Sequence, residues 1–196
     1  LYQDAKAMLA DEALPPAEEL VRHKPYPSMD RVVHLRPGFG LGLSMSSRRI
    51  YRYESINQEN LKGWYTGDGM LYLYNHDLTQ YSDEFWPTVD PYRLPGTTVD
   101  TQRRADGSGQ SGAPPVDWVG GSVLFDLFGA AGMELAAFQS TLRARKSWFF
   151  FDNEVVALGA AIRASDGRPI ETVVENRKLS SKADEALHVN GERMPS

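Results

Sequence analysis

The chain has 196 residues, a formal net charge of −5 at pH 7, 41% hydrophobic residues and no cysteine. Such a length suits one large domain, or one and a half small ones, with a sizeable buried core. The absence of cysteine excludes disulfide bonds and thiol chemistry. The acidic balance and the lack of a binding motif disfavour nucleic acid, and no apolar run is long enough to span a membrane. The residues that follow Leu1 do not have the pattern of a signal peptide, which carries no conclusion if the chain is an excerpt of a longer protein.

Residues 1–23 have a helical pattern. The apolar residues that recur at helical spacing are Tyr2, Ala5, Met8 and Leu9. The prolines at positions 15 and 16 open a second short helix over residues 17–23, with acidic residues in its first turn, where they suit the helix dipole. The segment KPYP at residues 24–27 then ends the helix and indicates a domain boundary.

From Asp30 onward the pattern becomes that of β-strands. Residues 31–35 and 39–45 are predicted strands joined by Pro37-Gly38, and residues 70–74 alternate with a period of two. Residues 31–63 hold six basic and two acidic side chains. The basic ones are Arg31, Arg36, Arg48, Arg49, Arg52 and Lys62. This excess favours a polyanionic partner, and the alternative is a solvated strand face.

The stretch 53–90 is the richest in side chains that could do chemistry. Glu54, Asn57, Glu59 and Asn60 place two carboxylates and two carboxamides within seven residues. Such a group can hold a cation, orient a histidine or arginine, or hydrogen-bond a sugar. The alternative is a polar turn whose side chains cap their own backbone. Gly67-Asp68-Gly69 predicts a tight turn, which could also cradle an anion.

Aromatic residues are frequent in the same stretch. They are Trp64, Tyr65, Tyr72, Tyr74, Tyr81, Phe85 and Trp86. Each could serve as a platform for a sugar ring or pack in a β-sheet core. The following residues 88–115 are loop-rich, and loops of this length are usually functional or mobile. The residues of this loop that could make polar contacts with a substrate are Tyr92, Arg93, Arg103 and Arg104. The alternative is an ordered surface loop without such contacts.

The remainder of the chain predicts an antiparallel β-sandwich. The expected strands are residues 122–128, 133–138, 144–151, 155–162 and 170–175. Asp152-Asn153 and residues 165–167 are predicted hairpin turns, and Asn190-Gly191 is another. The apolar run 148–151 is typical of a strand buried on both faces. We expect the sheet to continue past Ser196.

Several segments resemble polysaccharide lyase family 8, which comprises hyaluronate, chondroitin AC and xanthan lyases. The matching segments are PSMDRVVHLRPGFGLGLSMSSRRI, ENLKGWYTGDGMLYLYN, FWPTVDPYRLPGTT, RARKSWFFFDNEVVALGAAI and ETVVENR. The resemblance covers residues 25–177. It implies a mainly β fold, with residues 28–196 as the first part of a supersandwich-like antiparallel β-sandwich. Residues 1–27 would be short α-helices from the end of an α/α toroid domain.

The resemblance also implies a function, which is β-elimination on acidic polysaccharide by a secreted enzyme. In the family, an Asn, a His, a Tyr and an Arg of the upstream helical domain carry out proton transfer, and His23 and His34 do not match their motifs. The β domain contributes a Glu and an Asn three residues apart, which Glu54 and Asn57 match. Glu59 and Asn60 are second choices for the cleft.

The expected partners are an acidic polysaccharide and the upstream helical domain. Hyaluronan or chondroitin is the favoured substrate, with xanthan as an alternative, and the isolated segment should be inactive. A non-catalytic carbohydrate-binding sandwich is the other class of function that the residues allow. No cofactor is expected, although scattered carboxylates leave calcium open as an alternative.

Overall fold

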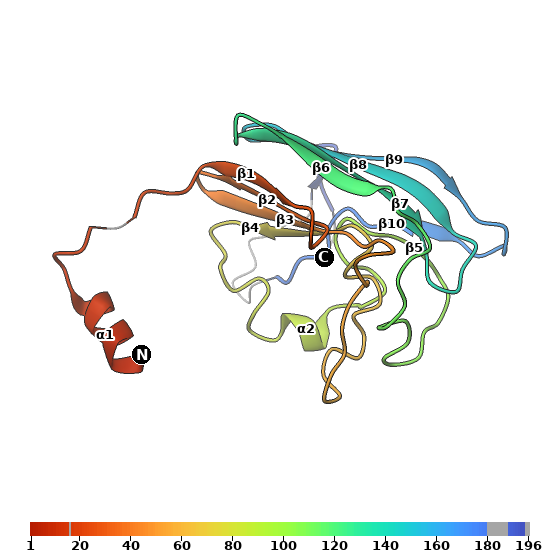
Figure 1. Cartoon of the computed structure of the whole chain (residues 1–196), viewed down its shortest axis with the longest axis horizontal. Coiled ribbons are helices and arrows are strands. Elements are labelled where there is room, and N and C mark those ends of the chain that lie inside the picture. Colours follow the sequence, from red (N-terminus) through yellow and green to blue (C-terminus); the bar gives the residue numbers. More distant parts are fainter. Residues whose placement is uncertain (16, 180–187, 195–196) are drawn as a thin grey trace.

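The computed structural model describes residues 1–15, 17–179 and 188–194. Its centre consists of two four-stranded antiparallel sheets that pack face to face (Figure 1). The first sheet has the order β1-β2-β3-β4 and the second the order β6-β7-β8-β9. The predicted mainly β, antiparallel sandwich is therefore confirmed.

The first sheet is built from short strands in chain order. They are β1 (Arg22–Tyr26), β2 (Arg31–Arg36), β3 (Phe39–Ser44) and β4 (Met70–Tyr74). The turn between β2 and β3 is the predicted Pro37-Gly38, where Gly38 has φ of 82° and so takes a conformation that glycine adopts without strain. Strand β4 has the bounds that its period of two predicts. A long loop, residues 45–69, joins β3 to β4.

The second sheet is also antiparallel throughout. Its strands are β6 (Val119–Leu124), β7 (Phe128–Ala136), β8 (Arg143–Phe150) and β9 (Val155–Arg163). The predicted strand over 122–128 is wrong in its bounds, because Phe125 and Asp126 have positive φ and turn the chain between β6 and β7. Asp152-Asn153 makes the predicted turn between β8 and β9.

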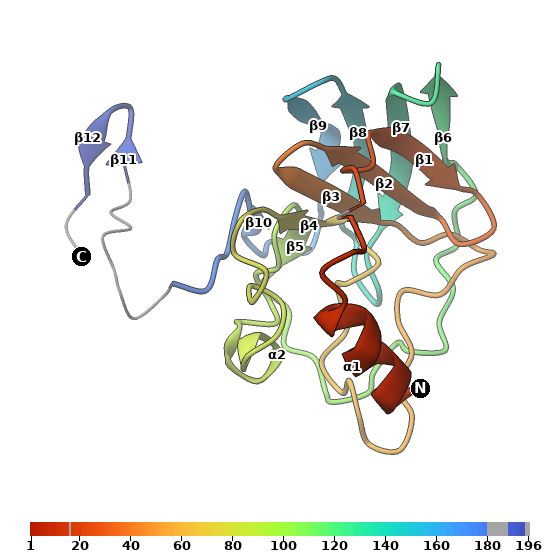
Figure 2. The same ribbon diagram turned by 90° about the vertical axis from the view of Figure 1, so that its left-hand side faces the viewer.

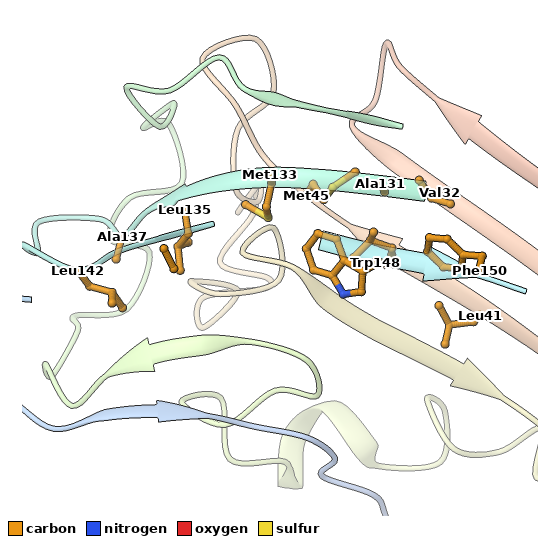
Figure 3. Packing of buried hydrophobic residues seen from close by; sticks show 12 residues of the cluster. Val32, Leu41, Met45, Ala131, Met133, Leu135, Ala137, Leu142, Trp148 and Phe150 are labelled. Carbon is orange, nitrogen blue, oxygen red and sulfur yellow. The ribbon is translucent and has the colours of Figure 1, made fainter. Parts of the chain in front are cut away.

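The main core lies between the two sheets. Figure 3 shows Met133, Trp148 and Phe150 gathered with Leu41 in this space. The prediction that residues 148–151 are buried on both faces is wrong. Trp148 and Phe150 are 1% exposed, whereas Phe149 is 38% exposed, so β8 alternates between a buried and an open face.

Smaller elements complete the fold. They are α2 (Phe85–Thr88), β5 (Thr98–Asp100), β10 (Ile170–Thr172), β11 (His188–Val189) and β12 (Glu192–Arg193). Strand β10 pairs with β5 rather than with β9, so residues 165–167 form a turn but not the predicted hairpin. Asn190-Gly191 makes the predicted hairpin between β11 and β12, which is visible in Figure 2.

Only one of the two predicted N-terminal helices is present in the described residues. Helix α1 (Tyr2–Ala10) has no buried residue. The helix predicted over residues 17–23 is wrong, since residues 17–20 are irregular and Arg22–Tyr26 form β1. Pairing with β2 buries His23 opposite His34, and this tertiary contact overrides the local helical preference.

Candidate functional site

The candidate site lies in the loop that joins β3 to β4. The backbone N–H of Gly69 donates to the carbonyl of Ser44 at 3.0 Å and closes the base of this loop. The loop projects from one end of the sandwich and appears in orange to gold in Figures 1 and 2. It presents Glu54, Asn57, Glu59 and Asn60, all of which are exposed.

A buried ion pair fixes the base of the loop. Arg52 and Asp68 are each 2% exposed, and their side chains approach to 3.3 Å. The Arg52 guanidinium also donates to the carbonyls of Gly112 (3.0 Å) and Ala136 (2.5 Å). The predicted turn at Gly67-Asp68-Gly69 is present. Its backbone N–H groups at Asp68 and Gly69 donate to the carbonyls of Tyr65 and Ser44, each at 3.0 Å, so these two groups are not available to cradle an anion.

Lys146 of β8 extends this buried cluster. It is 4% exposed, and its ammonium donates to the carbonyl of Gly96. Burial lowers the pKa of Lys146 to about 8, while the nearby Asp68 carboxylate opposes that shift. Burial also raises the pKa of Asp68 above its usual value, against the effect of Arg52. The charged forms of Lys146 and Asp68 are therefore each stabilised by the opposite charges at the base of the loop.

The tip of the loop is a series of polar turns. Asn57, Gln58 and Asn60 have φ of 51°, 62° and 52°, a left-handed conformation that asparagine tolerates better than most residues. The side-chain amide of Asn60 donates to the backbone carbonyl of Glu54 at 2.7 Å. The polar-turn alternative is therefore correct for the backbone, and the Glu54 carboxylate still projects from it into solvent.

Two adjoining grooves flank this loop. The first, of about 660 Å³, lies on the outer face of the first sheet and is lined by Glu54 and Asn60. The second, of about 900 Å³, is lined by Glu59, Asn60 and Trp86. Asn60, Thr66 and Tyr72 contribute to both grooves. Glu54 and Asn60 thus both line the first groove, whereas Asn57 lines neither groove and lies at the exposed tip of the loop.

The aromatic residues divide between the core and the grooves. Trp64, Tyr65 and Phe85 are at most 4% exposed, so they pack in the core and cannot stack on a sugar. Trp86 is 46% exposed, and it lines the second groove together with Tyr72. Burial raises the pKa of Tyr72 to about 12, which keeps its phenol neutral as a hydrogen-bonding group.

Most of the basic residues whose excess favours a polyanionic partner are buried or paired with a carboxylate. Arg36 and Arg52 are buried. The side chains of Arg48 and Arg49 pair with Asp117 (3.4 Å) and Asp30 (3.2 Å). Lys62 is exposed on the second groove and is the member of the set best placed to meet an anionic ligand there.

The contacts predicted in residues 88–115 are mainly structural. The Arg104 guanidinium is 3% exposed and donates to the Tyr65 hydroxyl at 2.8 Å. Tyr92 packs on Trp64 with ring centroids 5.0 Å apart, and the exposed Arg93 pairs with Glu171 at 2.8 Å. Arg103 is exposed. The alternative of an ordered surface loop therefore holds for Tyr92, Arg93 and Arg104.

Three residues near the site were missed by sequence reasoning. Gln58 and Asp106 line the second groove, and Gln110 accepts a hydrogen bond from the backbone N–H of Ser55 at 3.0 Å. Asp106 and Gln110 belong to the glycine- and serine-rich segment 105–112, whose composition indicates only a loop. No local pattern reveals that it packs against residues 52–61.

The described part of the chain contains no group of three or more His, Cys, Asp or Glu side chains that could hold a metal ion. Nor is any helix among these residues long and apolar enough to cross a membrane.

Residues 21–196 match the family model described as polysaccharide lyase family 8, super-sandwich domain. The chain therefore belongs to this family. It is 53% identical over 187 residues to a xanthan lyase from Bacillus sp. (strain GL1), covering 95% of this chain and 20% of that protein. It is 45% identical over 195 residues to a hyaluronate lyase from Thermasporomyces composti, covering 98% of this chain and 25% of that protein.

Solved structures agree with the sequence relatives. A Paenibacillus xanthan lyase superimposes with a TM-score of 0.90 at 51% identity, covering 99% of this chain and 18% of that chain. A Streptomyces coelicolor A3 chondroitin AC lyase in complex with chondroitin sulphate gives a TM-score of 0.87 at 47% identity, covering 97% and 26%. The chain spans a quarter or less of the curated relatives named above.

Proposed function

We propose that this chain is the β part of a secreted lyase that cleaves uronate-containing polysaccharide by β-elimination, and that Glu54 is its main contribution to the cleft. Family membership supports the reaction class. One structural observation carries the role of Glu54: its carboxylate is exposed on an open groove, whereas Asp68 at the base of the same loop is buried in an ion pair.

The chemistry defines what each part must supply. A base removes the proton at C5 of the uronate, the C4–C5 double bond forms, and the C4–O bond breaks as an acid returns a proton to the leaving oxygen. Charge develops on the uronate carboxylate, so hydrogen-bond donors must already face it. The resemblance assigns these tasks to Asn, His, Tyr and Arg side chains of an upstream helical domain.

Glu54 has a supporting task in this scheme. A carboxylate facing the Arg and His of the partner domain would hold both side chains in position and would stabilise their charged forms. The residues before β1 are proposed to be the end of that helical domain. The first groove would then lie where the two domains meet, and the isolated chain would be inactive because the proton-transfer residues are not in it.

The proposal for Glu54 is tested in the full-length enzyme. Glu54→Gln and Glu54→Ala should lower kcat at least about tenfold, equivalent to ~1.4 kcal/mol of transition-state stabilisation, because a charge that orients the partner residues is lost. Turnover is followed by the absorbance of the unsaturated uronate product. Glu192→Gln, on the distant hairpin β11–β12, is the control. Unchanged turnover with Glu54→Gln and Glu54→Ala would reject the role.

Glu59 and Asn60 remain second choices for the cleft. The same turnover assay distinguishes a role of Glu59 from the role proposed for Glu54. Glu59→Gln changes a carboxylate on the second groove only, so it should leave kcat within about twofold of the unmodified enzyme. A loss with Glu59→Gln that equals the loss with Glu54→Gln would transfer the role to the second groove.

Asn57 is proposed to contact the substrate. Its amide lies at the exposed tip of the loop, from which it can reach a chain bound between the two domains. Asn57→Ala should raise KM for uronate oligosaccharides about fivefold, because one hydrogen bond to the substrate is lost. Steady-state kinetics provide the measurement, and an unchanged KM and kcat would exclude the contact.

The substrate is proposed to be hyaluronan or chondroitin, with xanthan as the second candidate. The hyaluronate lyase relative and the chondroitin AC lyase structure support the first choice. The higher identity to the Bacillus xanthan lyase favours the second. Assaying the full-length protein on all three polymers decides between them. Binding without new absorbance on any of them would instead favour a non-catalytic carbohydrate-binding sandwich.

A further inference from the structure

The residues that surround Glu54 are all tied to one neighbouring segment. The side chain of Arg52 donates to the Gly112 carbonyl at 3.0 Å, and the Tyr53 hydroxyl donates to the Ser108 carbonyl at 2.8 Å. On the other side of Glu54, the backbone N–H of Ser55 donates to the side-chain oxygen of Gln110 at 3.0 Å. Residues 108–112 therefore support the backbone on both sides of Glu54.

This supporting segment is itself fixed from behind. Gly109 has φ of 79°, and a Cβ at this position would approach the Phe138 ring to 2.9 Å, so the backbone lies directly on that ring. The backbone N–H of Gly107 donates to the Leu61 carbonyl at 2.7 Å, near the end of the loop tip. The segment thus connects Phe138, two residues after β7, with the loop that carries Glu54.

Gln110 holds a distinct place among these contacts. Within residues 108–112, it alone reaches the loop through a side chain in the described hydrogen bonds, because Ser108 and Gly112 contribute backbone carbonyls. Beyond Ser55, the hydrogen bonds of the tip are local, from the Ser55 hydroxyl to Glu59 and from Asn60 to Glu54. Without Gln110, the tip would keep its own shape and its attachments at Tyr53 and Leu61, but the backbone immediately after Glu54 would lose its contact with residues 108–112.

We propose that Gln110 is a positioning residue, which fixes the backbone immediately after Glu54 and thereby aims the Glu54 carboxylate at its partners. This inference rests on the proposed role of Glu54. Small displacements of an orienting group are costly, since the groups it orients must be held close to their productive geometry. Gln110 contacts no reacting atom and acts only through Glu54.

The test uses the full-length enzyme. Gln110→Ala should lower kcat about fivefold and leave KM nearly unchanged, since one hydrogen bond that orders the loop is lost. Gln110→Glu keeps an acceptor oxygen at the same reach and should restore most of the activity. Ser111→Ala, at an exposed neighbour, is the matched control and should behave like the unmodified enzyme. Equal thermal unfolding midpoints establish that the variants fold alike.

A double-mutant comparison separates positioning from a general structural role. In the Glu54→Ala background, Gln110→Ala should cause no further loss of kcat, because the group that it positions is absent. The same fivefold loss in both backgrounds would overturn the inference, as would full activity of a folded Gln110→Ala enzyme. If Glu54→Ala itself retained full turnover, the proposed function would fail instead, so the two failures are distinguishable.

Discussion

Two histidines meet in the core between the sheets. His23 of β1 and His34 of β2 are at most 1% exposed, and their Nδ1 atoms lie 3.3 Å apart. One Nδ1 must carry a proton and the other must accept it, so the accepting ring is neutral in this contact. Burial, then His34 and Arg36, lower the pKa of His23 to about 4. Burial and Arg36 also lower the pKa of His34.

These lowered pKa values predict a loss of stability in acid. In the unfolded chain His23 binds a proton near pH 6.5, whereas in the folded chain it does so only near pH 4. The unfolded state therefore binds more protons as the pH falls through this window, and the free energy of unfolding decreases by an amount on the order of 3 kcal/mol. Asp152, which pairs with Arg36, partly offsets the lowering of the His34 pKa.

Replacement of His23 measures this contribution. His23→Leu should flatten the dependence of the unfolding free energy on pH between 6.5 and 4, whatever its effect at pH 7. Urea unfolding at a series of pH values provides the measurement. His76→Leu, at an exposed histidine, should keep the original slope. Equal slopes for the His23→Leu variant and the unmodified chain would contradict the assignment.

The sequence indicates which residues are suited to chemistry but not which of them are buried. Glu54 and Asp68 are both acids in glycine- and asparagine-rich surroundings, and no local pattern distinguishes them. Asp68 is buried because the loop closes over Arg52 and Lys146, and Lys146 lies 78 positions along the chain in β8. The family motif predicts a cleft role for Glu54, whereas the partner of Asp68 depends on tertiary contacts.

At the level of elements, the loop 45–69 is attached to the second sheet by charge as well as by packing. Arg52 donates to the carbonyl of Ala136 at the end of β7, and the positive charges of Arg52 and Lys146 both act on the Asp68 carboxylate. Removing one charge from a buried cluster leaves the others uncompensated, which costs more than the pair itself contributes. The loop that carries Glu54 should therefore be sensitive to changes at its base.

A comparison of two aspartates tests this. Asp68→Asn should lower the free energy of unfolding by about 3 kcal/mol or more, because Arg52 and Lys146 stay buried without a counter-charge. Asp117→Asn breaks the ion pair between Asp117 and Arg48, in which both side chains are more than half exposed. It should therefore lower the free energy of unfolding by less than about 1 kcal/mol. Urea unfolding of both variants provides the measurement. A similar decrease in unfolding free energy for Asp68→Asn and Asp117→Asn would show that Arg52 and Lys146 do not depend on the Asp68 charge.

Element types were easier to predict than element partners. Strand β4 follows from its alternation alone, and the turn between β2 and β3 from Pro37-Gly38. The helix predicted over residues 17–23 was wrong because β1 gains a paired neighbour in β2, which local propensity does not include. The pairing of β10 with β5 was likewise missed, since these strands are about 70 residues apart in the chain.

For the molecule as a whole, the outer face of the second sheet is unusually apolar. Phe149, Val156 and Leu158 are 38%, 42% and 55% exposed, and the pairing of Phe149 with Val156 places them on one face. Trp118, which is 56% exposed, borders a groove of about 430 Å³ beside Phe149. An apolar face of this kind marks an interaction surface in most folded proteins. We propose that this chain is part of a polypeptide as long as its relatives, and that a further part of that polypeptide covers this face.

The proposal is tested by comparing one substitution, Leu158→Lys, in the isolated chain and in the full-length protein. In the isolated chain, Leu158→Lys should reduce self-association and change the unfolding free energy by less than about 0.5 kcal/mol, since the side chain meets water. In the full-length protein the same lysine would be buried without a partner, and the unfolding midpoint should fall by several degrees. Leu158→Met is the volume-matched control and should be nearly neutral in both. Light scattering and thermal unfolding provide the measurements, and a neutral Leu158→Lys in the full-length protein would show that this face stays open.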